Sequence, residues 1–206
     1  DYSALRDSLD VPLFNRAIQG QYPPGSTIKP IMGMAGLESG LVTPETTVAD
    51  PGWYRLPGDS RMYRDWILRI RGTGHAPRVD LKMAIAESCD VYFYDLARRL
   101  TIDRMHDYLA PYGLGSRTGV DTTNERPGVL PSTRWKREAM AQPWYPGETV
   151  SAGIGQGYML ATPMQLAVAT SVLASRGERR IPRLLKAIDG EPVSAPALEP
   201  IETSDG

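Results

Sequence analysis

Residues 22–40 have the sequence YPPGSTIKPIMGMAGLESG, and they contain the start of a helix on which the rest of the chain is predicted to pack. Four apolar residues recur at helical spacing and share one face: Ile28, Ile31, Met32 and Ala35. Gly33 and Gly36 lack side chains, so a neighbouring element can approach closely. Pro30 falls in the first turn, where a missing N–H costs little. We therefore predict a core helix from Ser26 to about Gly40.

Outward from this helix, apolar periodicity predicts further helices separated by irregular segments. Helices are expected over residues 4–9, 81–100, 104–109, 132–141 and 163–176, the last opened by a capping box at Thr162 and stopped at Gly177. A strand is expected over residues 181–188. Residues 41–79 are predicted to form an irregular loop insert, residues 143–157 to be irregular, and residues 189–206 to be weakly ordered.

Composition limits the class of protein. The 206 residues suffice for one domain with its own core. Lys+Arg 23 against Asp+Glu 24 gives a formal net charge of -1, which argues against nucleic acid as a partner. No run of 18 apolar residues is present, so no membrane-spanning segment is expected within the chain. Because the sequence opens on Asp1 without a start methionine, we expect a piece of a longer protein whose anchor lies upstream.

Ser26 and Lys29 are the first candidates for chemistry. They are three residues apart at a helix start, so their Cβ atoms are expected to lie about 5–6 Å apart. An amine accepts a seryl proton only when uncharged, and burial in an apolar core favours the neutral form. The N–H of Ser26 is among the unsatisfied donors of the first turn and is available to an oxyanion. Ordinary surface helices also show this spacing, so that interpretation stays open.

Ser88-Cys89-Asp90 offers a second hydroxyl beside a carboxylate. The hydroxyl is suited to relaying a proton to a leaving amine. Taken in isolation, these residues are more typical of a helix break or cap. Cys89 is the single cysteine, so no intrachain disulfide can form.

Seven segments extend the pattern over nearly the whole chain: Tyr22–Pro30, Asp50–Trp53, Tyr63–Trp66, Glu87–Asp90, Trp144–Thr149, Gly153–Tyr158 and Ala161–Pro163. In order and spacing they resemble the penicillin-binding protein 2 family. The resemblance is to the elongation branch, since Asp90 stands where relatives of the division branch carry asparagine. Gly153–Gly157 lacks the context of a dinucleotide fingerprint and is predicted to pack beneath the cleft.

The resemblance implies an α+β penicillin-binding, serine β-lactamase-like fold, here truncated, with helices packed on a mostly antiparallel sheet. It also implies a serine D,D-transpeptidase that cross-links peptidoglycan stem peptides, is acylated by β-lactams and needs no cofactor for its chemistry. Ser26 would be the nucleophile and Lys29 the general base. Ser88 would carry the proton to the leaving D-alanine, and Asp90 would position that relay.

One expected motif is missing. The family's Lys-Thr/Ser-Gly motif on a strand edging the cleft is absent, because the four lysines are followed by Pro30, Met83, Arg137 and Ala187. We expect residues 1–206 to be a partial domain lacking both the anchor and pedestal region and this strand, and to be impaired or inactive alone. The resemblance places the full-length protein on the periplasmic face of the bacterial inner membrane. Its expected partners are a membrane glycan polymerase and proteins of the rod-shape complex.

A structural zinc site is also expected. Asp50, Asp65, His75 and Cys89 supply two oxygens, a nitrogen and a sulfur, a set that zinc accepts tetrahedrally. The residues alone favour a simpler interpretation, in which Asp50-Pro51-Gly52 is a turn and Cys89 is a small core residue. The resemblance favours the metal, because relatives with cysteine inside the second motif hold zinc at this corner. The ion would tie the 41–79 insert to Ser88 and Asp90.

Other functions stay open at this point. A D,D-carboxypeptidase or a β-lactamase would have the same fold, with water in place of the acceptor amine. A noncatalytic binding module is favoured only by the missing third motif. A run of arginines could contact anionic glycan or a partner, or form a solvated loop face: Arg55, Arg61, Arg64, Arg69, Arg71 and Arg78.

Overall fold

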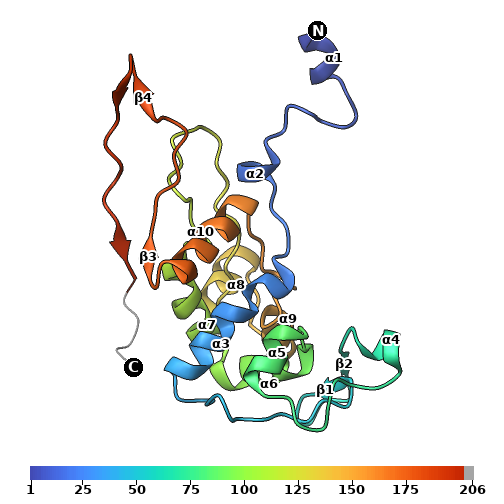
Figure 1. Ribbon diagram of the computed structural model, residues 1–206. Coiled ribbons are helices and arrows are strands. Elements are labelled where there is room, and N and C mark those ends of the chain that lie inside the picture. The colour runs from blue at the N-terminus through green and yellow to red at the C-terminus, as the bar shows by residue number, and fades with distance from the viewer. Residues whose placement is uncertain (202–206) are drawn as a thin grey trace.

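The computed structural model describes residues 1–201 and shows a body of helices from which two segments project (Figure 1). The helices that form or adjoin this body are α2 (Arg16–Gln19), α3 (Lys29–Glu38), α5 (Leu81–Ala86), α6 (Asp90–Leu100), α7 (Ile102–Leu109), α8 (Thr133–Met140), α9 (Pro146–Ala152) and α10 (Pro163–Ala174). The 3₁₀ segment η2 (Ala110–Tyr112) follows α7. The N-terminal segment with α1 (Tyr2–Arg6) projects on one side, and the strands after α10 project on the other.

Helix α3 lies at the centre, preceded by the 3₁₀ segment η1 (Gly25–Ile28). Its predicted apolar face is buried, with Ile28, Ile31, Met32 and Ala35 each at most 2% exposed. Burying each of the larger side chains contributes about 1.5–3 kcal/mol. The glycines allow close packing: a Cβ on Gly33 would lie 3.0 Å from Leu81 Cδ1, and one on Gly36 would lie 2.9 Å from Leu96 Cδ1. Helices α5 and α6 therefore pack directly against α3.

Every strand pair is antiparallel, and no sheet of the described residues has more than two strands. β1 (Trp53–Arg55) pairs with β2 (Met62–Arg64), with Tyr54 opposite Tyr63. β3 (Glu178–Arg179) pairs with β6 (Glu199–Pro200), and β4 (Ala187–Ile188) pairs with β5 (Glu191–Pro192). This combination of helices with antiparallel strand pairs agrees with the expected α+β class.

The predicted helix over residues 81–100 is wrong in one respect, because it consists of two helices. Ser88 has a φ of +55°, which a continuous right-handed helix does not allow. Asp65 Oδ2 accepts hydrogen bonds from the backbone N–H groups of Asp90 (2.7 Å) and Val91 (3.2 Å), so a side chain from the insert caps the start of α6. The break thereby exposes Ser88 at a helix junction.

Three other segments differ from the sequence predictions. The predicted irregular stretch 143–157 contains α9, whose Glu148 accepts a hydrogen bond from the Tyr145 N–H. The insert 41–79 contains the β1–β2 hairpin and α4 (Leu68–Arg71). The predicted strand 181–188 is reduced to β4, which turns at Asp189-Gly190, both with positive φ, into β5.

The helix expected over residues 4–9 instead occupies Tyr2–Arg6, because Asp1 accepts a hydrogen bond from the Ser3 N–H and starts it earlier. Of the predicted weakly ordered tail, residues 191–192 and 199–200 each take part in a strand pair, and 202–206 lie outside the described residues. The helices predicted at 132–141 and 163–176 are confirmed as α8 and α10. Across the described residues, no helix combines the length and apolar character needed to cross a bilayer.

Candidate active site

The exposed Ser26 lies in η1, and Lys29 begins α3 one turn later with only 1% of its surface exposed. The 3₁₀ turn is held from below by residues 153–157. Gly25 donates its N–H to the carbonyl oxygen of Gly155 (2.8 Å), and a Cβ on Gly155 would lie 2.3 Å from the Gly25 carbonyl oxygen. The glycine-rich segment thus packs beneath the serine, as predicted. Only glycine fits at position 155, because the two backbones approach each other so closely there.

Ser88 lies between Ser26 and Lys29. The hydroxyl oxygens of Ser88 and Ser26 are 2.8 Å apart, and Lys29 Nζ is 3.0 Å from Ser88 Oγ. Lys29 Nζ also donates to the Ser88 carbonyl oxygen at 2.8 Å. The hydrogen bonds therefore form a continuous chain from the nucleophile candidate through Ser88 to the amine. The sequence predicted the members of this chain, and the structure adds that the path from Ser26 to the amine passes through Ser88.

Asp90 completes the cluster. Its Oδ1 lies 2.6 Å from Lys29 Nζ in a pair whose side chains are 2% exposed for Lys29 and 12% for Asp90. Burial raises the pKa of the Asp90 carboxyl above its ordinary value, although the Lys29 amine opposes that shift. The amine also lies 5.3 Å from the centre of the Phe93 ring. Two oxygens of Ser88 and one of Asp90 lie within hydrogen-bond distance of Lys29 Nζ and fix the position of the amine.

Trp66 is a residue of this site to which sequence reasoning gave no role. Its Nε1 donates to the Ser88 carbonyl oxygen at 3.0 Å, and the side chain is nearly half exposed. The Ser88 carbonyl oxygen therefore accepts hydrogen bonds from both the Trp66 indole and the Lys29 amine. These two bonds hold Ser88 in its left-handed conformation. The only signal in the sequence was an aromatic residue within the segment Tyr63–Trp66.

The four predicted metal ligands lie together behind this corner. The ligand atoms of Asp50, Asp65, His75 and Cys89 all lie within 4.8 Å of one another. Three groups converge on one carboxylate oxygen, Asp50 Oδ2: His75 Nδ1 at 2.6 Å, the His75 N–H at 3.0 Å and Cys89 Sγ at 3.3 Å. His75 Nδ1 is also 3.6 Å from Asp65 Oδ2, and the three side chains Asp50, Asp65 and His75 are fully covered.

The charges of this cluster suit a cation. Burial, joined by the negative charges of Asp50 and Asp65, raises the pKa of the Cys89 thiol. Burial also disfavours ionised Asp50, but hydrogen bonds from His75 and Gly52 outweigh it and hold the pKa of Asp50 below its ordinary value. Two carboxylates and a thiol around one imidazole are an unfavourable grouping without a positive charge, and they are the donor types that zinc takes.

A family model described as the penicillin binding protein transpeptidase domain matches residues 2–204. The chain belongs to the penicillin-binding protein transpeptidase domain family. The peptidoglycan D,D-transpeptidase MrdA of Acinetobacter baumannii is 48% identical over 190 residues, which make up 92% of this chain. Those residues make up 28% of the length of that relative, so the chain spans less than a third of it.

Solved structures of penicillin-binding proteins agree with this family assignment. PBP2 of Pseudomonas aeruginosa in complex with WCK 5153 has a TM-score of 0.90 at 48% identity, with 99% of this chain and 44% of that chain covered. PBP2 of Helicobacter pylori in a complex with MreC has a TM-score of 0.84 at 35% identity, with 97% of this chain and 35% of that chain covered. The predicted penicillin-binding protein family and the α+β class are confirmed.

Proposed function

We propose that this chain carries the nucleophile of a peptidoglycan D,D-transpeptidase, which joins stem peptides during cell elongation. One observation carries the proposal: in a transpeptidase-family domain, Ser26 Oγ, Ser88 Oγ and Lys29 Nζ form an unbroken hydrogen-bonded chain with steps of 2.8 and 3.0 Å. A serine hydroxyl is a weak nucleophile until a base removes its proton, and this chain connects it to an amine.

Acylation follows from this geometry. Ser26 Oγ bonds to the carbonyl carbon of the penultimate D-alanine, and its proton passes through Ser88 to the uncharged Lys29 amine. The bond to the terminal D-alanine then breaks, and the leaving nitrogen takes a proton back from Lys29 by the same path. Asp90 holds the amine in line with Ser88 through its 2.6 Å contact. A β-lactam ring, opened by the same attack, leaves an ester on Ser26.

Deacylation completes the transfer. The amine of a second stem peptide bonds to the carbonyl carbon of the ester, and the bond to Ser26 Oγ breaks. The oxygen recovers its proton through Ser88. Splitting one difficult exchange into two acyl transfers is what a covalent nucleophile provides. The N–H of Ser26 is one oxyanion donor, and a second belongs to the Lys-Thr/Ser-Gly strand expected downstream of Gly206.

The site of action and the partners belong to the full-length protein. We infer that it is anchored upstream of Asp1 and works on the periplasmic side of the inner membrane. The H. pylori PBP2 structure with MreC supports a partner of the rod-shape complex. The expected glycan polymerase partner fits the same machinery, because cross-linking requires newly made strands.

A bound zinc ion would be structural. Asp50, Asp65, His75 and Cys89 would hold it, and four protein ligands complete a tetrahedral shell. When bound, zinc would supply the positive charge that this cluster lacks. The cluster also contacts the catalytic corner directly, since His75 Nε2 lies 3.2 Å from the Glu87 carbonyl oxygen and Asp65 caps α6. The ion would thereby hold residues 87–90 in place.

The test is covalent labelling of the full-length protein with fluorescent penicillin, followed by mass spectrometry of its peptides. We expect one adduct, on the peptide that contains Ser26. Product analysis with a donor and an acceptor peptide should then give mainly the cross-linked product. Absence of an adduct, or an adduct on another residue, contradicts the proposal, and release of hydrolysed penicillin within seconds would favour the β-lactamase alternative.

Gly155 provides a second test. In Gly155→Ala the added Cβ would lie 2.3 Å from the Gly25 carbonyl oxygen, so the 3₁₀ turn with Ser26 must shift. Since a displacement of about 1 Å can cost about 10²-fold in rate, we expect acylation by penicillin to slow by that order. Gly157→Ala is the matched control, because it has the same φ of +70° but its Cβ would meet only Ser151 Cβ at 3.4 Å. Equal rates for the two variants would contradict the assigned role of Gly155.

A further inference from the structure

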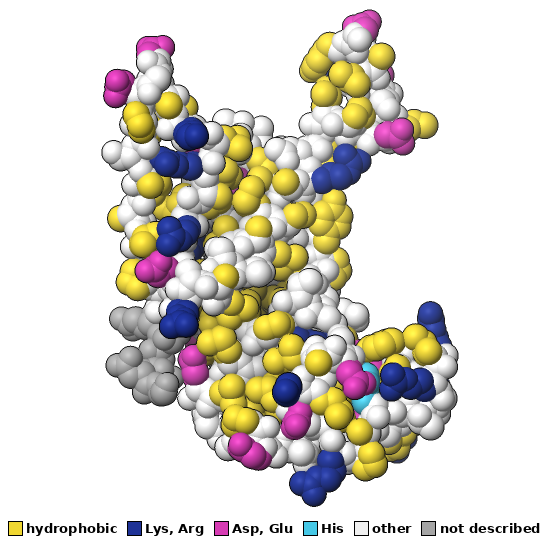
Figure 2. All heavy atoms as spheres, in the orientation of Figure 1, with side chains coloured by type: hydrophobic (Ala, Val, Ile, Leu, Met, Phe, Trp, Pro, Cys, Tyr) yellow, Lys and Arg dark blue, Asp and Glu magenta, His cyan; other side chains and the backbone are white. Residues whose placement is uncertain are grey.

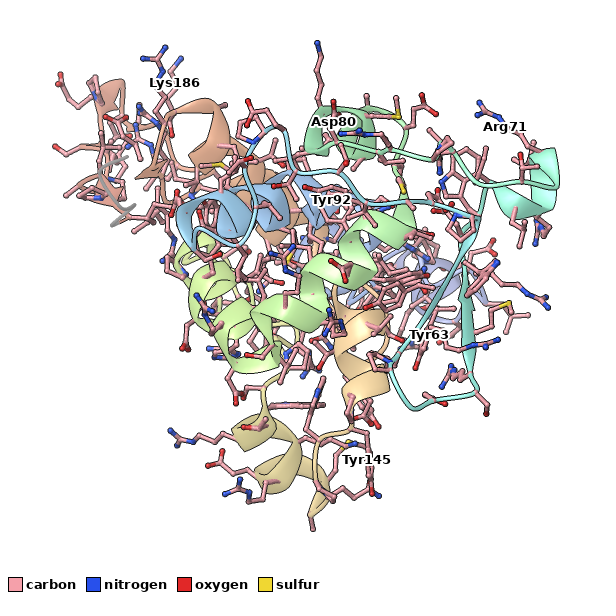
Figure 3. All side chains as sticks on the ribbon, turned by 90° about the horizontal axis from the view of Figure 1, so that it is seen from below. Tyr63, Arg71, Asp80, Tyr92, Tyr145 and Lys186 are labelled. Carbon is pink, nitrogen blue, oxygen red and sulfur yellow. The ribbon has the colours of Figure 1, made fainter. Side chains whose placement is uncertain are left out.

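Trp66 follows β2 and precedes α4, in the lobe that these elements form with β1 (Figure 1). In the space-filling view this lobe shows hydrophobic side chains among those of Lys and Arg (Figure 2). Seen from below, Tyr63 and Arg71, between which Trp66 lies in the chain, are on the same side of the molecule (Figure 3). The Trp66 side chain is nearly half exposed, so directed contacts rather than enclosure in the core fix its indole.

The first of these contacts reaches the catalytic relay. Trp66 Nε1 donates to the Ser88 carbonyl oxygen at 3.0 Å, and Lys29 Nζ donates to the same oxygen at 2.8 Å. A carbonyl oxygen has two lone pairs, so these two donors satisfy it. Ser88 has a φ of +55°, a conformation that serine keeps only where surrounding contacts impose it. Because the Ser88 hydroxyl lies on the proton path, the indole N–H helps to set the position of that hydroxyl.

The second contact reaches the cluster of predicted metal ligands. The Trp66 indole meets the His75 imidazole edge-on, with ring centres 5.8 Å apart and ring planes at 67°. The residue before Trp66, Asp65, belongs to the same cluster and caps α6 by accepting from the Asp90 N–H. Two members of the cluster therefore set the position of the indole, Asp65 through the backbone and His75 through its ring.

The position of the His75 ring depends on what its cluster holds. His75 Nδ1 lies 2.6 Å from Asp50 Oδ2 and 3.6 Å from Asp65 Oδ2, and Nε2 lies 3.2 Å from the Glu87 carbonyl oxygen. With zinc bound, His75 would be held by a metal–nitrogen bond, whereas without the ion hydrogen bonds alone hold it. Because the ring borders the indole, a change in the hold on His75 is passed to Trp66.

We propose that Trp66 is a positioning residue of the acylation step and that it transmits the occupancy of the metal cluster to Ser88. The inference rests on the proposed transpeptidase function. Trp66 acts through Ser88: its N–H holds the Ser88 carbonyl oxygen and thereby keeps the Ser88 hydroxyl in line between Ser26 Oγ and Lys29 Nζ. The contacts from His75 to Trp66 and from Trp66 to Ser88 thus link the cluster to the rate of acylation as well as to the stability of the fold.

The first test is Trp66→Phe in the full-length protein, which keeps an aromatic ring beside His75 but removes the indole N–H. The limiting rate of acylation by fluorescent penicillin should fall about tenfold, as for the loss of one hydrogen bond that holds the relay. The penicillin concentration at half-maximal rate should stay within about twofold of wild type. Trp53→Phe is the matched control, because Trp53 is exposed in the same lobe and its ring contacts Arg55. An unchanged limiting rate in Trp66→Phe, or an equal fall in Trp53→Phe, overturns the positioning role.

The second test measures the link to the cluster. A strong chelator should slow acylation of the wild-type and Trp53→Phe proteins about tenfold, but that of Trp66→Phe by less than about twofold, because the link to Ser88 is already broken. The melting temperatures of all three proteins should fall equally on chelation, since each loses the same ion. Wild-type acylation that is indifferent to the chelator, or a slowing in Trp66→Phe as large as in wild type, overturns the transmission through Trp66.

A spectroscopic measurement separates this inference from the proposed function. In full-length protein labelled with 5-fluorotryptophan, the fluorine resonances of Trp66 and Trp53 are assigned by their absence from the two phenylalanine variants. Chelation should shift the Trp66 resonance and leave that of Trp53 in place. If the wild-type protein forms no acyl-enzyme, the proposed function fails while this shift still judges the contact between the cluster and the indole. A Trp66 resonance that does not respond to chelation overturns the link whatever the outcome for catalysis.

Discussion

Replacing Lys29 with methionine in the full-length protein is expected to slow acylation of Ser26 by about 10³-fold, the usual contribution of a positioned acid–base group. Lys29 Nζ is the end of the hydrogen-bonded chain through Ser88, so its loss leaves the Ser26 proton without an acceptor. Methionine has a similar length and apolar stem, so the packing of α3 is largely kept. The measurement is the rate of covalent labelling by fluorescent penicillin at several concentrations.

A structural effect of the same change must be separated from the chemical one. Lys29→Met leaves Asp90 buried without its partner, and breaking such a pair typically costs about 3–5 kcal/mol. Adding Asp90→Asn removes the uncompensated charge, so the double variant should regain most of the lost thermal stability. Its acylation should stay as slow as that of Lys29→Met. Recovery of the rate together with stability would show that Lys29 acts on folding rather than on Ser26.

The sequence predicted the elements whose signals are local. The buried face of α3, the helix expected over residues 132–141 and the capping box of α10 all depend on neighbouring residues, and all agree with the structure. The break at Ser88 could not be predicted this way. Residues 81–100 have continuous helical periodicity, and the cap that starts α6 comes from Asp65, 25 residues earlier in the chain.

The catalytic candidates were identified from their residue types and spacing, but the hydrogen bonds that connect them depend on tertiary structure. Spacing suggested that Lys29 faces Ser26, whereas the folded chain inserts Ser88 between them through its left-handed backbone. Trp66 was given no role from the sequence, because its hydrogen bond to the Ser88 carbonyl oxygen depends on how the segment after β2 lies against the Ser88 corner. The metal ligand set was suggested by the donor types of its four residues and favoured by the family resemblance, and the folded chain brings its members together.

Removing the proposed zinc ion is the second change for which we expect a large effect. An ion bound at about a thousand times its dissociation constant stabilises the folded state by about 4 kcal/mol. For a domain of about 200 residues each kcal/mol shifts the melting temperature by about 2–4 °C, so a strong chelator should lower it by about 8–16 °C. Acylation should slow as well, because residues 87–90 lose the support of His75 and Asp65. Elemental analysis before and after chelation gives the zinc content.

The two histidines of the chain provide matched controls. His75→Ala removes a ligand, so its melting temperature should already be low and should not respond to the chelator. His106 lies away from the cluster, with Nδ1 3.2 Å from the Leu130 carbonyl oxygen. The melting temperature of His106→Ala should therefore fall on chelation as much as that of the wild-type protein. Added zinc should restore the chelated wild-type protein but not His75→Ala. If the wild-type melting temperature is indifferent to chelation, then Asp50, Asp65, His75 and Cys89 hold the corner through their own hydrogen bonds and not through a metal ion.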